Sequence, residues 1–286
     1  MIDLVGPFSE FAFMRRALAG CVALSVAAPP IGVFLTLRRM SLMSDAMSHA
    51  VLPGAALGYL AAGLSLPAMT LGGLAAGLAV ALASGLVARV TVLREDASLA
   101  AFYLLSLAAG VVLVSLRGSS VDLLHILFGS VLALDDAALW LLGAIATVTL
   151  IGLALIHRPL VMECVDGEFL RGVGRSSAPT HFAFLGLVVL NLVGGFAALG
   201  TLLAVGLMLL PAIAARFWTD DLTAMVPLSM LLGIASSTIG LLLAYHAGLP
   251  AGPAIVLAAG GIYLLSMLAG RRGFLPRLLP RRHLEA

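Results

Sequence analysis

The chain has 286 residues, of which 62% are hydrophobic and only 10% are charged, and its mean hydropathy is +1.14. Soluble domains carry about 25% charged residues, so the composition excludes an ordinary soluble protein and indicates an integral membrane protein. The net charge of +2 identifies no partner class, but all 16 basic residues are Arg. A P-loop needs a Lys for its phosphate contacts, so this chain carries none, and if its function is driven by ATP the ATPase is another polypeptide.

The first apolar run, 17–37, is long enough to span a membrane, and acidic residues precede it, so we expect no cleavable signal peptide. Cys21 and Cys164 lack any redox or metal-binding spacing and are interpreted as apolar packing residues. The whole chain, 1–286, is therefore expected to form one transmembrane domain.

Six intervals contain no charged residue and predict where the helices lie: 17–37, 46–88, 97–116, 137–156, 176–215 and 222–270. A span needs about 20 residues, so the second, fifth and sixth intervals are long enough for two helices each. Gly and Pro residues predict the turns inside them, at 63–67, 194–200 and 248–253. The prediction is an all-α bundle of eight to nine transmembrane helices, eight if 201–216 is only a half-helix, with 123–134 as an interfacial or re-entrant piece. Small residues every four positions predict a smooth packing face: Gly73, Gly77, Ala81 and Gly85.

The distribution of Arg supports nine helices. Alternating sides place 13 Arg residues on one side and only Arg15, Arg16 and Arg117 on the other. The positive-inside tendency assigns the larger set to the cytoplasm, which puts the C-terminus inside and the N-terminus outside.

The stretch 38–54 places Asp45 and His49 at the start of a long uncharged region. On a helix, a spacing of four residues puts the carboxylate and the imidazole on one face, where they could share a ligand. Pro53 predicts a helix break that frees the His49 carbonyl oxygen as a third candidate ligand. With Arg39 at the membrane surface, His49 lies about 15 Å deep, near the middle of the hydrocarbon core. Ionisable groups there default to a functional role, although an Asp–His pair that only fixes two helices is the alternative.

The chemistry of this pair indicates a divalent transition metal. Imidazole and carboxylate together suit zinc, manganese and ferrous iron, whereas copper would favour Cys or Met clusters. One Asp and one His are too few for a closed four-ligand zinc site, but two copies facing each other across a dimer axis would supply four. An incomplete shell also suits an ion that must be released, so the metal is expected as a transported ion and no permanently bound cofactor is expected.

Other residues are weaker candidates. His125 and His246 are expected on the outer side, where either could receive metal. Pro211 would free the Leu207 carbonyl and predicts a second helix break that could line a pathway. Acidic residues near helix ends are interpreted as solvated caps: Asp135, Asp136, Asp220 and Asp221.

The segment 157–175 is predicted as a cytoplasmic loop with charged and Gly residues, either a solvated connector or a docking element for a cytoplasmic partner. His157 and His181 border it and are expected at the surface. The Arg-rich tail 271–286 is expected to bind anionic lipid headgroups.

Several stretches together carry a family resemblance. Residues 38–50 read Arg-Arg-Met-Ser-Leu-Met-Ser-Asp-Ala-Met-Ser-His-Ala, and 166–174 read Asp-Gly-Glu-Phe-Leu-Arg-Gly-Val-Gly. The first resembles a motif of the permeases of zinc- and manganese-type metal-ion ABC importers. The second is similar to their coupling-loop pattern of Asp-x-Glu-x-Ala, three residues and Gly, with Leu170 in place of Ala. Stretches 200–216 and 240–253 extend the likeness over nearly the whole chain.

The resemblance implies a homodimeric permease with the fold of vitamin B12-type (type II) importers, in a bacterial inner membrane. It implies a cytoplasmic ATP-binding subunit and an extracytoplasmic metal-binding protein as partners, and no nucleic acid. Asp45 and His49 would line the metal path, with zinc favoured and manganese or iron as alternatives. The residues expected to act in coupling to the ATPase are Glu163, Asp166, Glu168, Arg171 and Gly174.

Three rival interpretations were weighed. A proton-coupled secondary metal carrier also needs acid and imidazole groups in mid-membrane, but the pattern of 45–53 has no second copy, as paired repeats would give. An intramembrane enzyme lacks support, since neither His-Glu-x-x-His nor Gly-x-Ser-x-Gly occurs. A siderophore or vitamin permease of the same fold would have no use for Asp45 and His49.

Overall fold

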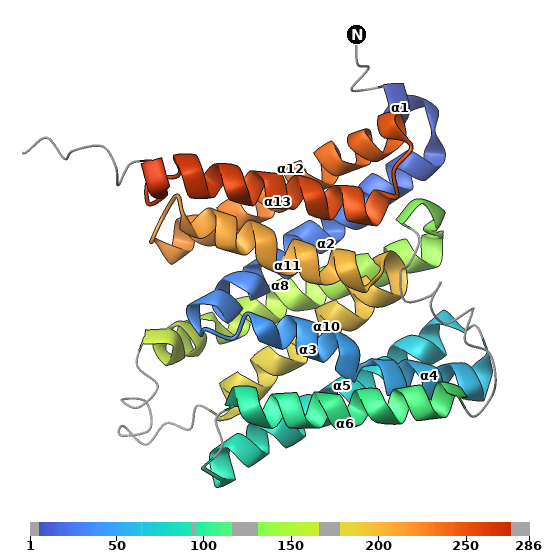
Figure 1. The fold of residues 1–286 in the computed structure, drawn as a ribbon, viewed down its shortest axis with the longest axis vertical. Helices are drawn as coiled ribbons and strands as arrows, with labels where there is room; N and C mark the ends of the chain where they lie inside the picture. Colours follow the sequence, from blue (N-terminus) through green and yellow to red (C-terminus); the bar gives the residue numbers. More distant parts are fainter. Residues whose placement is uncertain (1–5, 64, 93–94, 116–130, 166–177, 276–286) are drawn as a thin grey trace, which may run out of the picture.

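The computed structural model describes residues 6–63, 65–92, 95–115, 131–165 and 178–275. Within these ranges the chain is helical, as the composition predicts (Figure 1). The helices are α1 (Gly6–Glu10), α2 (Ala12–Leu37), α3 (Leu42–Ala50), α4 (Leu52–Ala62), α5 (Leu66–Val90), α6 (Glu95–Ser115), η1 (Val131–Ala133), α8 (Asp136–Val165), α10 (Ala178–Leu199), α11 (Thr201–Arg216), α12 (Leu222–Ala247) and α13 (Ala251–Ala269).

Among the described residues, seven helices are long and apolar enough to cross a membrane: α2, α5, α6, α8, α10, α12 and α13. Two further passes are shorter. Helices α3 and α4 follow each other with only Val51 between them, and α11 has 16 residues. The order of passes therefore agrees with the nine predicted from uncharged intervals, with the second pass split in two.

Contacts between distant segments show which helix ends lie together. At one end of the bundle, Arg38 after α2 meets Glu163 near the end of α8, and Arg272 after α13 meets Asp220 before α12. At the opposite end, Arg16 near the start of α2 lies 3.1 Å from Asp136 at the start of α8. The first end, here called the Arg-rich end, carries the larger set of Arg residues.

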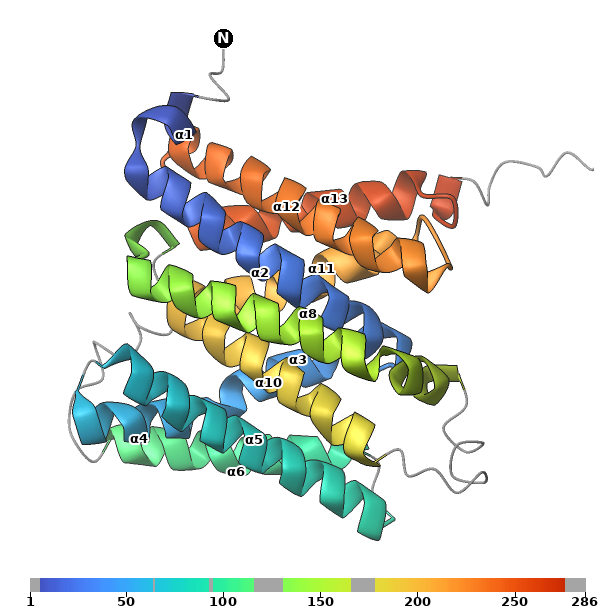
Figure 2. The ribbon, with the colours of Figure 1, turned by 180° about the vertical axis from the view of Figure 1, so that it is seen from behind.

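Helices α2 and α10 form the centre of the bundle, because most of their residues are buried by neighbouring helices. Figure 2 shows α2, α8 and α10 side by side across one face, with α11, α12 and α13 beyond α2 and with α4, α5 and α6 beyond α10. The predicted small-residue face of α5 packs as expected: Gly77 approaches Val189 of α10, and Gly85 approaches Phe182.

One predicted turn is shorter than expected, and two predicted boundaries were wrong. The turn expected at 194–200 is a single residue, Gly200, whose φ of 99° is open to glycine and strained for other residues. The predicted loop 157–175 begins as helix, because α8 continues through Pro159 to Val165. Helix α11 does not break at Pro211 but runs on to Arg216. In each case packing against neighbouring helices holds a helix where local signals predicted an end.

Candidate functional site: the Asp45–His49 face of helix α3

Helix α2 ends in a tight turn that sets the start of α3. The Met40 N–H donates to the Leu35 carbonyl at 2.8 Å, and the Arg39 N–H donates to the Thr36 carbonyl at 3.2 Å. This is the Schellman pattern, in which the residue after the cap adopts the left-handed conformation and is usually Gly. Here that residue is Arg39, with φ of 59°. A non-Gly residue in this region costs about 1 kcal/mol, so surrounding contacts must hold the turn.

Helix α3 presents Asp45 and His49 on one face, as the spacing predicted. Their side chains are 68% and 45% exposed, and His49 Nε2 lies 3.9 Å from Asp45 Oδ1. The opposite face of α3 is buried, with Met43 and Met47 in the core. The carboxylate and imidazole thus lie side by side and open, at a separation that leaves room for an ion to contact both.

The break after α3 lies at Val51, two residues before Pro53, which occupies the first turn of α4, where a missing N–H is tolerated. Near the break, the Ser106 hydroxyl of α6 donates to the Ala50 carbonyl at 2.9 Å. A neighbouring helix therefore satisfies a backbone group at the break, as a membrane interior requires. The break thus lies two residues before Pro53, and the role of the His49 carbonyl as a ligand stays a prediction.

The exposed face of α3 lies in the middle of the molecule. Figure 1 shows α3 crossing the front between α11 above and α6 below, and α3 packs against α5, α6, α10 and α11. Leu42 on the same face is 84% exposed. A carboxylate and an imidazole directed at acyl chains would cost several kcal/mol, so this face needs water or another protein surface against it.

The structure does not bring the other predicted metal residues to this pair. His246 is exposed at the end of α12, next to Tyr245, whose ring lies 5.8 Å from Phe11 near the chain start. Pro211 is buried inside α11. His125, Asp166, Glu168, Arg171 and Gly174 lie outside the described residues. Within the described ranges, no three His, Cys, Asp or Glu side chains are grouped as metal ligands.

Glu163 and His181 lie in the interior, contrary to the surface position predicted for His181. The Glu163 side chain is 11% exposed, with Oε2 2.6 Å from an Arg38 guanidinium nitrogen. His181 is 6% exposed, with Nδ1 3.4 Å from Arg38 and 3.9 Å from Glu163. From the sequence, Arg38 counted only among the Arg residues of the expected cytoplasmic side and was assigned no other role. Glu163 is the single charged residue in the apolar run 159–165. A carboxylate in such a run needs a cation from another segment, and this was the signal in the sequence for a buried partner.

The tail prediction also changes at one residue. The Arg272 side chain pairs with Asp220, and the Arg272 backbone N–H donates to the Phe217 carbonyl at 3.0 Å. Arg272 therefore ties the end of α13 to the α11–α12 connection. The other Arg residues of the tail stay candidates for lipid contact.

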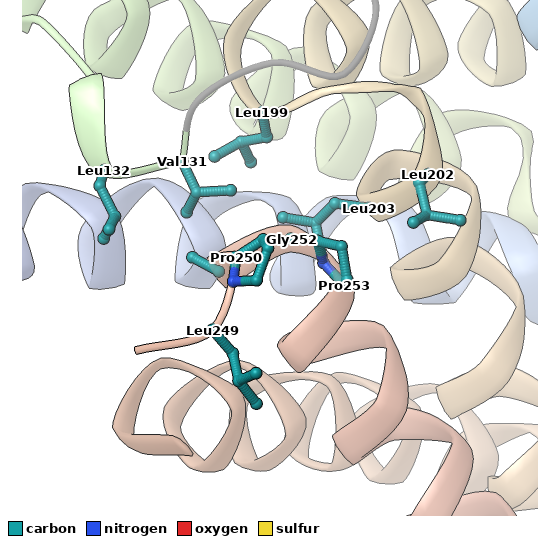
Figure 3. Close-up of a pocket in the computed structure, with 10 residues that line it drawn as sticks. Val131, Leu132, Leu199, Leu202, Leu203, Leu249, Pro250, Gly252 and Pro253 are labelled. Carbon is teal, nitrogen blue, oxygen red and sulfur yellow. The ribbon is translucent and has the colours of Figure 1, made fainter. Parts of the chain in front are cut away.

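An apolar pocket of about 430 Å³ lies at the end opposite the Arg-rich end (Figure 3). Helix η1, the α10–α11 turn and the α12–α13 connection form its wall, and the lining residues are Val131, Leu132, Leu199, Leu202, Leu203, Leu249, Pro250, Ala251, Gly252 and Pro253. None of these described lining residues carries a metal-ligating side chain. Among the described residues, the Asp45–His49 face carries the exposed acid–imidazole pair that could bind a metal.

The fold and this face define the chain as a multi-pass helical membrane protein with an acid–imidazole pair on a broken central helix. Comparison with known proteins narrows this class. The model of the ABC 3 transport family matches residues 10–270. The manganese import permease ScaB of Streptococcus parasanguinis is 31% identical over 92% of this chain and 93% of that protein. The manganese transport membrane protein MntC of Listeria monocytogenes is 33% identical over 93% and 94%.

Solved structures agree with the fold. PsaBC from Streptococcus pneumoniae, solved with a Fab, superposes with a TM-score of 0.83 at 29% identity, over 96% of this chain and 98% of that one. An ABC transporter of the metal-chelate type in an inward-facing conformation gives a TM-score of 0.68 at 15% identity, over 93% and 89%, a likeness of fold alone. The chain therefore belongs to the ABC 3 transport family: it is a permease subunit of an ABC transporter and is not itself catalytic.

Proposed function

We propose that this chain forms the membrane path of an ATP-driven importer for manganese, in which Asp45 and His49 contact the ion in transit. The observation that carries the proposal is the open acid–imidazole pair on α3, with the two side chains 3.9 Å apart and facing away from the chain's own core. Manganese replaces the zinc favoured by the sequence because both relatives described above are named for manganese. Carboxylate oxygen suits manganese, and imidazole does not exclude it.

The pair is incomplete in one chain, which supports a homodimer. Two ligands hold a divalent ion weakly, whereas two copies with their α3 faces opposed would offer two carboxylates and two imidazoles. The same arrangement removes exposed polar groups from lipid, which a single chain cannot do. The His49 carbonyl oxygen, which accepts the Val51 N–H in the structure, stays a candidate third ligand.

The partners and the orientation follow from the same proposal. The Arg-rich end faces the cytoplasm, where a separate ATP-binding subunit contacts the segment 157–175, including Asp166, Glu168, Arg171 and Gly174. An extracytoplasmic binding protein delivers the metal to the opposite end. The remaining Arg residues of the tail 271–286 contact lipid headgroups in a bacterial inner membrane.

The experiment is uptake into proteoliposomes that contain the permease with its own ATP-binding subunit, supplied with loaded binding protein. We expect Asp45→Asn and His49→Gln each to lower manganese uptake at least about tenfold, because each removes a metal ligand from a site that has few ligands. Parallel arms with zinc and ferrous iron measure selectivity. Full uptake in both variants, or transport of a metal chelate in place of the free ion, would refute the proposal.

A matched control is Asp136→Asn, which neutralises an exposed carboxylate at the start of α8, at the end of the bundle opposite the Arg-rich end. We expect its uptake to equal that of the unmodified protein. A proton-coupled carrier is distinguished in the same assay, since its uptake would follow a pH gradient without ATP.

A further inference from the structure

Three residues from three different helices form a buried charged group at the Arg-rich end, here called the Arg38 cluster: Arg38, Glu163 and His181. Arg38 follows the last residue of α2, Glu163 lies in the last turn of α8, and His181 lies in the first turn of α10. All three side chains are at most 11% exposed. The Arg38 guanidinium also lies 5.2 Å from the ring centre of Phe184, a cation–π contact.

A buried ion pair needs a reason beyond stability. Removing an acid and a base from water costs several kcal/mol each, and apolar residues of similar volume commonly stabilise a fold as well or better. The rest of this bundle is joined by close apolar and small-residue contacts, such as Gly77 against Val189. The Arg38–Glu163 ion pair, 2.6 Å between a guanidinium nitrogen and Oε2, holds two helix ends at a fixed separation.

The positions of its members show what the cluster connects. Arg38 directly precedes Arg39, the left-handed residue of the turn from which α3 starts, and Asp45 follows one turn into α3. Glu163 lies two residues before the end of α8, within the segment 157–175 that is proposed to contact the ATP-binding subunit. Because the Arg39 turn is strained, its geometry depends on the contacts that hold Arg38.

We propose that the Arg38 cluster is a positioning device that transmits movement of the α8 end to the α2–α3 turn, and thereby sets the placement of Asp45 and His49 during transport. The inference rests on the proposed function. Arg38, Glu163 and His181 act through other residues and do not contact the metal. ATP binding and hydrolysis then alter the metal face because the end of α8 and the start of α3 cannot move independently while Arg38 holds Glu163.

The test replaces the pair by apolar residues of similar volume, Arg38→Met with Glu163→Leu, so that no buried charge is left alone. The complete transporter is purified with its ATP-binding subunit, and thermal unfolding is measured first. Proteoliposomes then report the manganese taken up per ATP hydrolysed in the presence of loaded binding protein. We expect a thermal midpoint close to that of the unmodified protein and at least about a fivefold lower ratio of manganese to ATP.

The chain offers a matched control, because a second ion pair joins the same two helices at their other ends. Arg16 and Asp136 lie 3.1 Å apart, and both side chains are largely exposed. Arg16→Met with Asp136→Leu removes an α2–α8 ion pair without touching the α2–α3 turn, and we expect an unchanged ratio. Glu163→Asp keeps a carboxylate and is expected to recover part of the coupling that Glu163→Gln loses.

Two results would overturn the inference. One is a stable Arg38→Met, Glu163→Leu transporter with the original ratio of manganese to ATP. The other is a ratio of manganese to ATP that falls by the same factor in the Arg16→Met, Asp136→Leu control. If the apolar pair lowers the thermal midpoint, Glu163→Asp is compared with Glu163→Gln instead. A higher ratio of manganese to ATP in Glu163→Asp supports the inference, and equal ratios overturn it. Failure of the proposed metal path is a separate outcome, since it appears as normal uptake in Asp45→Asn.

Discussion

Gly54 ends the stretch 38–54, and α4 packs against α5 at this residue with no room for a methyl group. A Cβ added at Gly54 would lie 2.0 Å from the Gly72 carbonyl oxygen and 2.6 Å from the Ala76 Cβ. Carbon–oxygen contacts are rarely closer than about 3.3 Å, so Gly54→Ala must move α4 away from α5 by about 1.3 Å. Overpacking of this kind costs about 1 to 3 kcal/mol of unfolding free energy.

The displacement reaches the metal face, because only Val51 separates α4 from α3. Groups that act together on one ligand lose much of their effect when displaced by about 1 Å. We therefore expect Gly54→Ala to lower both the thermal midpoint and manganese uptake, the latter by about tenfold. The assays are thermal unfolding of the purified transporter in detergent and uptake into proteoliposomes.

Gly143→Ala is the matched control, since a Cβ at Gly143 on α8 meets no atom of the described residues within 4 Å. Alanine is favoured over glycine in a helix by about 0.5 to 1 kcal/mol, so this variant should be slightly more stable and fully active. If Gly54→Ala matches Gly143→Ala in both assays, the close approach of α4 and α5 does not position α3, and the reasoning fails.

Two further predictions concern helix ends. Arg39→Gly should raise the unfolding free energy by about 1 kcal/mol, because glycine adopts a φ of 59° without strain, whereas Arg39→Ala keeps the Cβ and should show no gain in the same thermal assay. At the start of α12, the backbone N–H and hydroxyl of Thr223 donate to Asp221 and lower the pKa of this exposed carboxyl. The stability from this cap is present above the unfolded pKa of about 4 and is lost as the pH falls through the lowered folded value. The gap in thermal midpoint between the unmodified protein and Asp221→Ser should therefore shrink on acidification, and a pH-independent gap would contradict the role of the charge.

The sequence determined the membrane passes and the acid–imidazole pair. Each pass needs about 20 residues without charge, so the uncharged intervals, the Gly and Pro turns inside them and the distribution of Arg together predict the number of passes. The spacing of Asp45 and His49 alone places them on one face of a helix. These features depend on neighbours in the chain, and sequence carries that information directly.

The tertiary structure decided which helix ends meet. Nothing local distinguishes buried Arg38 from exposed Arg39, and His181 is buried only because the ends of α2 and α8 lie beside it. Likewise α8 continues past Pro159 and α11 past Pro211 because neighbouring helices hold them, although proline signals an end. The Arg38–Glu163 ion pair joins segments 125 residues apart in the chain, so it appears only once the helices are packed.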